Sequence, residues 1–172
     1  MRLAFIGYMG SGKSSLGRSL SEFLNIPLVD LDTYIENKEG ETISNLFKTR
    51  GVIYFRKKES DYLREICSTN TDMILSVGGG TPVYGSNMDL LNGSFTTLYL
   101  RANVPTLSSR LQNERGHRPL IAHLADGELS EFIGKHLFER GKFYEKSKLI
   151  VDVNNKSETE VLSDVKKLIE SE

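Results

Sequence analysis

Residues Gly7–Ser14 have the types and the spacing of a phosphate-binding loop. Their order, Gly-Tyr-Met-Gly-Ser-Gly-Lys-Ser, matches the pattern G-x-x-x-x-G-K-S/T in full, with an apolar run before it and helical periodicity after it. The glycines let successive backbone N–H groups turn inward around a phosphate, and the start of the following helix adds a partial positive charge. Lys13 supplies a full charge to the β- and γ-phosphates, and the Ser14 hydroxyl can bind Mg²⁺. We therefore expect a nucleoside triphosphate to bind here.

Carboxylates follow the next apolar run, and glycines follow the one after it. Asp30 and Asp32 are separated by one residue, so alternation along an extended chain would direct both carboxylates to the same side. One could hold Mg²⁺, directly or through water, while the other accepts or orients an acceptor hydroxyl. The alternative is that they cap the following helix.

The glycines Gly78–Gly80 predict a wall of backbone N–H groups close to the transferred phosphate, and a flexible turn is the alternative.

Arginine suits the bidentate recognition of a planar carboxylate better than lysine does. Arg56, Arg118 and Arg140 are therefore candidates for binding an acidic substrate, although arginines are also common surface residues. The three histidines show no spacing typical of a zinc site, and we assign no zinc-type metal centre.

Short apolar runs alternate with longer segments of helical periodicity along the chain. The runs expected to form strands are Leu3–Ile6, Pro27–Asp30, Met73–Val77, Phe95–Leu100 and Leu149–Val153. Clear helical periodicity marks Ser14–Leu24 and Glu160–Ile169. This alternation predicts an α/β fold in which helices cover both faces of a parallel sheet, and such sheets bind ligands at the carboxyl ends of their strands.

Two stretches are longer or more polar than a simple crossover requires. Asp32–Ile66 is charged and mostly helical, and we expect it to be an insertion over residues 32–66. Gln112–Asp126 is polar, contains glycine and has no clear periodicity, so residues 112–126 are a candidate lid beside the ligand face; a plain surface loop is the alternative. The length of 172 residues argues for one domain, residues 1–172, with these two segments inserted.

Composition excludes several classes of protein. With 38% hydrophobic and 26% charged residues, the chain is not disordered as a whole. Lys plus Arg total 22 and Asp plus Glu total 23, so no general basic field for nucleic acid is expected. No apolar run approaches the ~18 residues that span a membrane, Gly10–Lys13 interrupts any signal peptide, and the single Cys67 fits a reducing compartment; we expect a cytoplasmic protein. We expect a monomer, because no long heptad repeat or apolar patch is readable.

In combination, these motifs resemble the shikimate kinase family, whose members phosphorylate shikimate on the route to chorismate. The resemblance rests on the phosphate-binding loop, Asp30-x-Asp32, Phe55-Arg56 followed by Glu59, Gly78-Gly79-Gly80, Arg118-Pro119-Leu120, and Arg140 four residues before Tyr144. It runs from Leu3 to about Asp152, and the ordered combination is far more specific than the loop alone. It implies a three-layer α/β/α P-loop kinase fold with a five-stranded parallel sheet, and transfer of the γ-phosphoryl group of ATP to the 3-hydroxyl of shikimate with Mg²⁺.

The resemblance also assigns roles to individual residues. The ATP phosphates would bind the loop residues Gly10, Ser11, Gly12, Lys13, Ser14 and Ser15. Ser14 would hold Mg²⁺, and Asp30 would help to position the ion through water. Asp32 would bind shikimate hydroxyls and orient the one that attacks.

At the acceptor, Arg56 and Arg140 would bind the shikimate carboxylate, and Gly79 would contribute a backbone contact. Arg118 would swing in on the lid, contact ATP and stabilise charge on the transferring phosphate. The family often places an arginine against adenine after the last strand, but Asn154–Ser157 offers none, so the adenine contact is not assigned.

Two other functions fit parts of the sequence. A kinase of another small hydroxy acid, such as gluconate, would share the scaffold, but it gives no reason for the three glycines together with Arg118-Pro119-Leu120. A nucleotide-dependent switch would need a guanine-reading signature. Asn155–Glu158 has Glu where that signature requires Asp, and we interpret it as the start of a helix.

Overall fold

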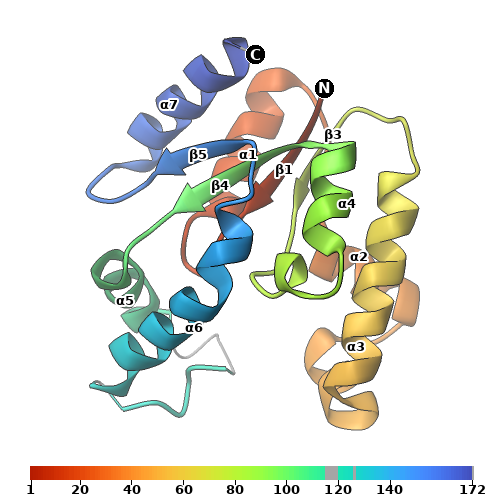
Figure 1. Ribbon diagram of the computed structural model, residues 1–172, viewed down its shortest axis with the longest axis vertical. Coiled ribbons are helices and arrows are strands. Elements are labelled where there is room, and N and C mark those ends of the chain that lie inside the picture. Colours follow the sequence, from red (N-terminus) through yellow and green to blue (C-terminus); the bar gives the residue numbers. More distant parts are fainter. Residues whose placement is uncertain (115–119, 126, 172) are drawn as a thin grey trace.

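The computed structural model describes residues 1–114, 120–125 and 127–171, and a five-stranded parallel sheet lies at its centre (Figure 1). The strands are β1 (Arg2–Ile6), β2 (Leu28–Asp30), β3 (Met73–Ser76), β4 (Thr96–Arg101) and β5 (Leu149–Asp152). Their spatial order is β2-β3-β1-β4-β5, and every pairing is parallel. Each strand expected from the sequence is present to within one residue at either end, so the predicted α/β class is confirmed.

Helices cover both faces of this sheet. They are α1 (Lys13–Leu24), α2 (Leu31–Glu39), α3 (Ile43–Cys67), α4 (Asn87–Ser94), α5 (Val104–Gln112), α6 (Glu128–Tyr144) and α7 (Glu158–Glu170), with a 3-10 helix, η1 (Thr81–Val83). α1 packs against β1, β3 and α7 on one face, whereas α4 packs against β4 and α3 on the other. The result is three layers, α/β/α, with α5 and α6 beyond the carboxyl ends of the strands (Figure 1).

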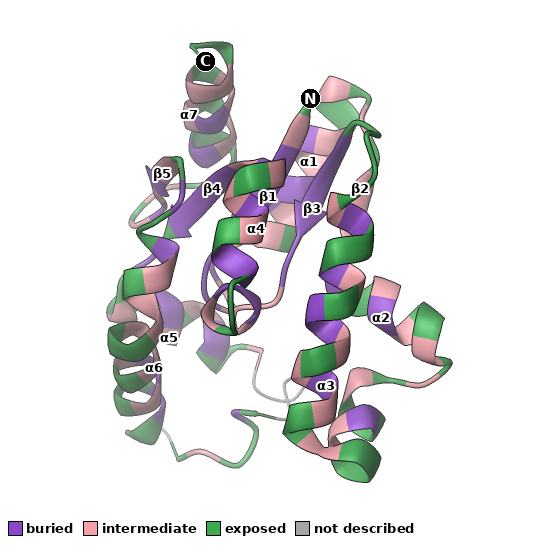
Figure 2. Cartoon of the chain, turned by 45° about the vertical axis from the view of Figure 1, so that its right-hand side comes forward, coloured by how far each residue is buried: buried purple, intermediate pink, exposed green. Residues whose placement is uncertain are grey.

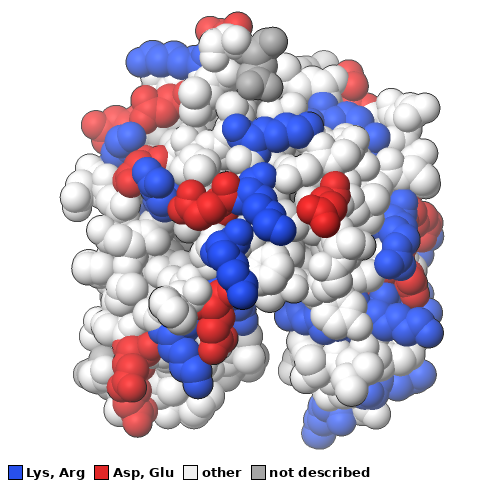
Figure 3. Space-filling model, viewed as in Figure 1, with Lys and Arg blue, Asp and Glu red and all other residues white. Residues whose placement is uncertain are grey.

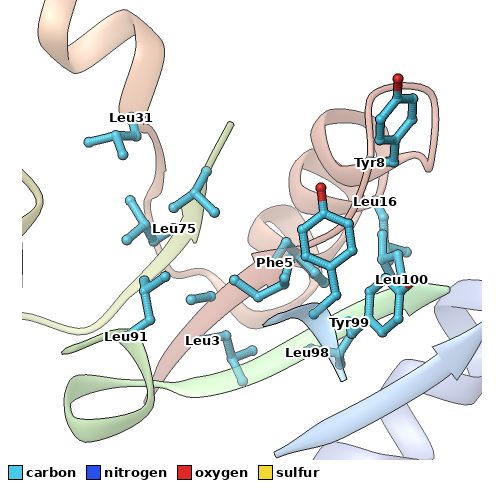
Figure 4. Packing of buried hydrophobic residues seen from close by; sticks show 14 of the residues in the cluster. Leu3, Phe5, Tyr8, Leu16, Leu31, Leu75, Leu91, Leu98, Tyr99 and Leu100 are labelled. Atoms are coloured by element: carbon cyan, nitrogen blue, oxygen red, sulfur yellow. The ribbon is translucent and has the colours of Figure 1, made fainter. Parts of the chain in front are cut away.

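The central strands β3, β1 and β4 are largely buried on both faces, which explains why they read as continuous apolar runs rather than alternating ones, whereas the edge strands β2 and β5 are mostly half-buried. Every residue of Leu3–Ile6 in β1 is no more than 2% exposed. Figure 4 shows side chains of β1, β3, β4 and α1 packed around Phe5, and Figure 2 shows the buried strands between helices whose outer surfaces are exposed. Burying one large apolar side chain contributes about 1.5–3 kcal/mol. The well-packed sheet therefore fixes the positions of the loops at its carboxyl edge.

Two local features shape the helical layers. Ser157 caps α7, and Glu160 completes a capping box by accepting a hydrogen bond from the Ser157 backbone N–H at 2.7 Å. Asn155–Glu158 therefore leads into a helix, as the sequence predicts.

The charged stretch after β2 forms α2 and α3, and α3 is kinked at Gly51, where φ is 83° and ψ is 171°. Within the described residues, no helix is both long and apolar enough to cross a membrane.

Candidate active site

The chain turns sharply after β1 and forms the phosphate-binding loop before α1 begins at Lys13. Gly7 and Gly12 have φ values of 149° and 102°, in the region that favours glycine. A Cβ on Gly7 would also lie 3.0 Å from the carbonyl oxygen of Leu100 in the neighbouring strand. The loop therefore depends on glycine at these positions, and its backbone leads into a helix N-terminus, where anions bind.

A cavity of about 610 Å³ lies over this loop at the carboxyl edge of the sheet. Its walls include the expected residues Gly10, Ser11, Gly12, Lys13, Ser14, Ser15, Asp30, Asp32 and Gly79. Arg110, Val153 and Glu158 also line it. The volume is ordinary for a cofactor or small-molecule site. One cavity thus brings together the loop, both aspartates and part of the glycine segment.

Lys13 lies at the start of α1 and folds back over the loop. Its Nζ donates hydrogen bonds to the carbonyl oxygens of Gly7 and Tyr8, at 2.8 and 2.9 Å. Two residues later, the Ser15 hydroxyl donates to Oε2 of Glu158 at 2.5 Å. The hydrogen bonds of Lys13 hold its ammonium group beside the N-terminus of α1. The ammonium charge and the positive end of the helix both favour an anion in the cavity.

Asp30 and Asp32 both line the cavity, but they do not lie together on one extended strand. β2 ends at Asp30 and α2 begins at Leu31, so Asp32 belongs to the first helical turn rather than to an extended segment. Oδ1 of Asp30 accepts a hydrogen bond from the backbone N–H of Thr33 at 3.1 Å and caps α2. The prediction that both carboxylates lie along one extended segment is therefore wrong. The alternative, that an aspartate caps the following helix, is correct for Asp30. Both aspartates nevertheless line the same cavity.

The pKa of Asp32 is raised to about 6. Loss of surrounding water is the main cause, although the side chain still meets water from the cavity side. The negative charges of Asp30 and Glu59 raise the pKa further. The positive charges of Lys13 and Arg56 act in the opposite direction. A carboxylate with a pKa close to neutral pH is well suited to accept a proton from a hydroxyl group.

Arg56 and Arg140 come from distant elements and meet at the glycine segment. A Cβ on Gly80 would lie 2.8 Å from Cζ of Arg56, and one on Gly79 would lie 3.5 Å from Nη1 of Arg140. Neither arginine is in the wall of the 610 Å³ cavity, so they border a site next to it. The arginines belong to α3 and α6, and the surface is hollowed between the two lobes that contain these helices (Figure 3). Two guanidinium groups beside exposed backbone can bind a carboxylate.

Arg56 is held by a buried polar network. Its Nη1 donates to Oε2 of Glu59 at 2.5 Å, and Oε1 of Glu59 accepts from the Thr81 hydroxyl at 2.6 Å. Asn87 donates in turn to the carbonyl oxygen of Thr81 at 2.9 Å. Arg56 and Glu59 are three residues apart, a spacing that places them on one helix face. Thr81 and Asn87 carry no such signal, and sequence reasoning missed them.

Arg110 of α5 is a further residue that sequence reasoning missed. Its guanidinium donates to three backbone carbonyl oxygens, those of Gly10 and Ser11 in the loop and of Val153 after β5, at 3.2–3.3 Å. It therefore joins the loop to the segment beyond the last strand on the cavity wall. Only the packing of α5 reveals this role. Arg118, expected to act from the lid, lies outside the described residues.

Oxygen ligands for a divalent cation are present on the cavity wall. Ser14 offers a hydroxyl and Asp30 a carboxylate, and both are hard donors of the kind that Mg²⁺ prefers. Mg²⁺ usually takes one or two protein ligands and completes its octahedron with substrate phosphates and water. The donor set therefore fits this ion.

The phosphate-binding loop follows the central strand of the sheet, and a carboxylate with a raised pKa lines the same cavity. By fold and by site, the protein is a P-loop kinase.

Comparison with known proteins identifies the family. A family model described as shikimate kinase matches residues 9–170. A shikimate kinase of Flavobacterium psychrophilum is 36% identical over 169 residues, which cover 98% of each chain. The crystal structure of a shikimate kinase from Bacteroides thetaiotaomicron superimposes with a TM-score of 0.92 at 32% identity, over 99% of this chain and 98% of that one. The shikimate kinase of Acinetobacter baumannii, solved in complex with shikimate, gives a TM-score of 0.87 at 27% identity, over 98% and 92%. The chain belongs to the shikimate kinase family.

Proposed function

We propose that this protein transfers the γ-phosphoryl group of ATP to the 3-hydroxyl of shikimate, forming ADP and 3-phosphoshikimate for aromatic amino acid biosynthesis. The position of Gly79 carries the proposal. A Cβ on this residue would lie 3.4 Å from the carbonyl oxygen of Gly7 in the loop and 3.5 Å from Nη1 of Arg140. An acidic acceptor bound at the arginine would therefore lie next to the donor phosphates. The relative that was solved with shikimate supports the choice of acceptor.

On the donor side, the phosphates of ATP would lie over Gly10–Ser15, where backbone N–H groups and the N-terminus of α1 favour negative charge. Lys13 would transfer its hydrogen bonds from the loop carbonyls to the β- and γ-phosphate oxygens. The nucleoside would extend along the cavity toward Arg110 and Val153. Positioning and charge neutralisation are the main requirements of phosphoryl transfer, and these groups supply both.

Ser14 would bind Mg²⁺ directly, and Asp30 would hold it through water, because Asp30 also caps α2. When bound, the ion neutralises negative charge on the β- and γ-phosphates.

Asp32 would act as the base. It accepts the proton of the 3-hydroxyl while the hydroxyl oxygen forms a bond to the γ-phosphorus. The bond between that phosphorus and the bridging oxygen breaks, and its electron pair leaves with ADP. The raised pKa of Asp32 lets the side chain be ionised at neutral pH and still hold a proton well.

Arg56 and Arg140 would bind the shikimate carboxylate, with Gly79 as a backbone contact. Residues 32–66, which include most of α2 and of α3, would form the acceptor side of the site. Residues 112–126 would form a lid from which Arg118 contacts ATP and stabilises charge on the transferring phosphate. We propose one domain over residues 1–172, acting as a cytoplasmic monomer.

A scan of acceptors tests the proposed function. Purified protein is mixed with Mg²⁺ and ATP, and ADP release is measured with shikimate, with gluconate and without an acceptor. We expect release that depends on shikimate. Release with gluconate alone would instead indicate a different hydroxy-acid kinase, and equal release without an acceptor would indicate a nucleotide-hydrolysing module. A Lys13→Met variant is the control, and it should lose turnover with every acceptor.

A further inference from the structure

Tyr8 is the second residue of the phosphate-binding loop, and it is only 1% exposed. Its backbone carbonyl accepts a hydrogen bond from Nζ of Lys13 at 2.9 Å. Its side chain stands beyond the end of β1, above Leu16 (Figure 4). The pattern G-x-x-x-x-G-K-S/T leaves this position unspecified, so phosphate binding by itself does not require tyrosine here.

The hydroxyl of Tyr8 is hydrogen-bonded to a side chain of α6. It lies 2.9 Å from Nδ1 of His136, and the two rings are tilted by 57° with their centroids 5.9 Å apart. The imidazole also packs against Phe132, with a centroid distance of 4.3 Å. Burial raises the pKa of Tyr8 to about 12, while burial and the nearby Arg140 charge lower the pKa of His136. Both pKa shifts favour the neutral groups, and the hydroxyl and Nδ1 share one hydrogen bond in which the tautomer of the ring sets the donor.

The same tyrosine ring contacts Arg140. Cζ of Arg140 lies 5.6 Å from the centroid of the Tyr8 ring, within the range of a cation–π interaction. His136 and Arg140 are four residues apart on α6, so they lie on one helix face. Tyr144, one turn further along the helix, donates to the carbonyl oxygen of Gly79 at 2.5 Å. The Arg140 guanidinium is thus bordered by Tyr8 on one side and by the glycine segment on another.

We propose that Tyr8 and His136 are positioning residues for the acceptor: their hydrogen bond fixes α6 against the phosphate-binding loop, and the Tyr8 ring then holds the Arg140 guanidinium where the acceptor carboxylate binds. The inference rests on the proposed function, in which Arg140 binds that carboxylate. Through Tyr8, the loop that binds the donor also sets the position of a group that binds the acceptor. The residue thereby links the two halves of the site.

The test compares Tyr8→Phe, His136→Leu and the double variant by steady-state kinetics. Tyr8→Phe keeps the ring and removes only the hydroxyl. Each single change should raise the KM for shikimate by about fivefold, the effect expected from losing one hydrogen bond, and leave the KM for ATP within about twofold. The double variant should be no worse than the worse single variant, because both changes break the same bond. His136→Asn keeps a hydrogen-bonding amide near the position of Nδ1, able to donate or to accept, and should restore most of the shikimate affinity.

Tyr34→Phe is the matched control. It also removes one phenol hydroxyl, which donates to Glu65 at 2.9 Å where α2 packs against α3, and it should leave both KM values unchanged. If the shikimate KM effects of Tyr8→Phe and His136→Leu multiply, the two side chains act separately and the inference is overturned. It is also overturned if they leave that KM unchanged while Arg140→Ala raises it, although the proposed function then stands. If Arg140→Ala has no effect on shikimate KM, the proposed carboxylate site itself is wrong.

Discussion

Arg56 and Glu59 are joined by a hydrogen bond of 2.5 Å between a half-buried guanidinium and a carboxylate that is only 1% exposed. The other oxygen of Glu59 accepts from Thr81, so the carboxylate is anchored on both sides. A charge buried this deeply is tolerated because it is paired and fully hydrogen-bonded. The arrangement holds one edge of the Arg56 guanidinium and leaves its remaining N–H groups for a ligand.

Glu59→Gln should therefore weaken acceptor binding. The amide keeps the shape of the side chain but removes the charge, so we expect the KM for shikimate to rise about tenfold with little change for ATP. Unfolding should become easier by about 1–2 kcal/mol, since one charged hydrogen bond becomes a weaker one. Steady-state kinetics and urea unfolding measure the two effects. Glu65→Gln is the control, because Glu65 pairs with Lys38 at the exposed surface and should matter little.

Gly80→Ala should impair the same arginine by crowding. A Cβ at this position would lie 2.8 Å from Cζ of Arg56, so the guanidinium must move away from the glycine segment. The end of an arginine is flexible, and φ of Gly80 is −89°, so stability should hardly change while the KM for shikimate rises severalfold. Gly93→Ala, with no atom within 4 Å of the added carbon, is the control for a harmless methyl group. A normal shikimate KM for Gly80→Ala would remove Arg56 from the acceptor site.

Neutralising the acceptor carboxylate tests the arginine pair from the side of the ligand. The methyl ester of shikimate keeps every hydroxyl but loses the charge, so wild-type protein should use it with a KM at least about tenfold higher. In a variant that carries both Arg56→Ala and Arg140→Ala, acid and ester should be used equally poorly. Kinetics with both acceptors measure this preference. A preference for the acid that survives in the double variant would place the carboxylate elsewhere.

The pKa of Asp32 predicts a pH dependence. If this carboxylate is the base, kcat/KM for shikimate should fall as the pH drops below about 6, because the protonated side chain cannot accept the hydroxyl proton. Asp30 raises the pKa of Asp32, so Asp30→Asn should move this limb of the profile to lower pH. Asp32→Asn should reduce kcat by at least about a hundredfold. A profile that is flat from pH 5 to 8 would rule out Asp32 as the base.

The same shift has a consequence for stability. The folded protein raises the pKa of Asp32, so this group favours folding below its ordinary pKa of 3.8, and the contribution is lost as the pH rises through about 6. At pH 7.5, Asp32→Asn should therefore be as stable as wild type or slightly more stable, by less than about 1 kcal/mol because the side chain meets water. Thermal unfolding of the two proteins at pH 4 and pH 7.5 measures the difference. Marked destabilisation at pH 7.5 would contradict the environment described for Asp32.

The sheet could be predicted closely from the sequence because its central strands are buried on both faces and therefore appear as apolar runs, and the half-buried edge strands β2 and β5 are mostly apolar as well. The loop could be predicted because its glycines and Lys13 obey a fixed spacing. The geometry of Asp30 and Asp32 was left open, since an Asp at the end of a strand can either continue the extended chain or cap a helix, and the structure shows that Asp30 caps α2. Contacts between distant segments were equally hidden. His136 meets Tyr8 across 128 positions only because α6 packs beside the loop.

The site of phosphorylation is the most direct test of the central claim. Phosphorus NMR can follow a reaction that contains Mg²⁺, ATP, shikimate and catalytic amounts of the protein. We predict a new phosphomonoester signal, coupled to the ring proton on carbon 3, that grows in step with ADP. Inorganic phosphate as the only new product, or a phosphate coupled to a different ring proton, would contradict the proposed transfer.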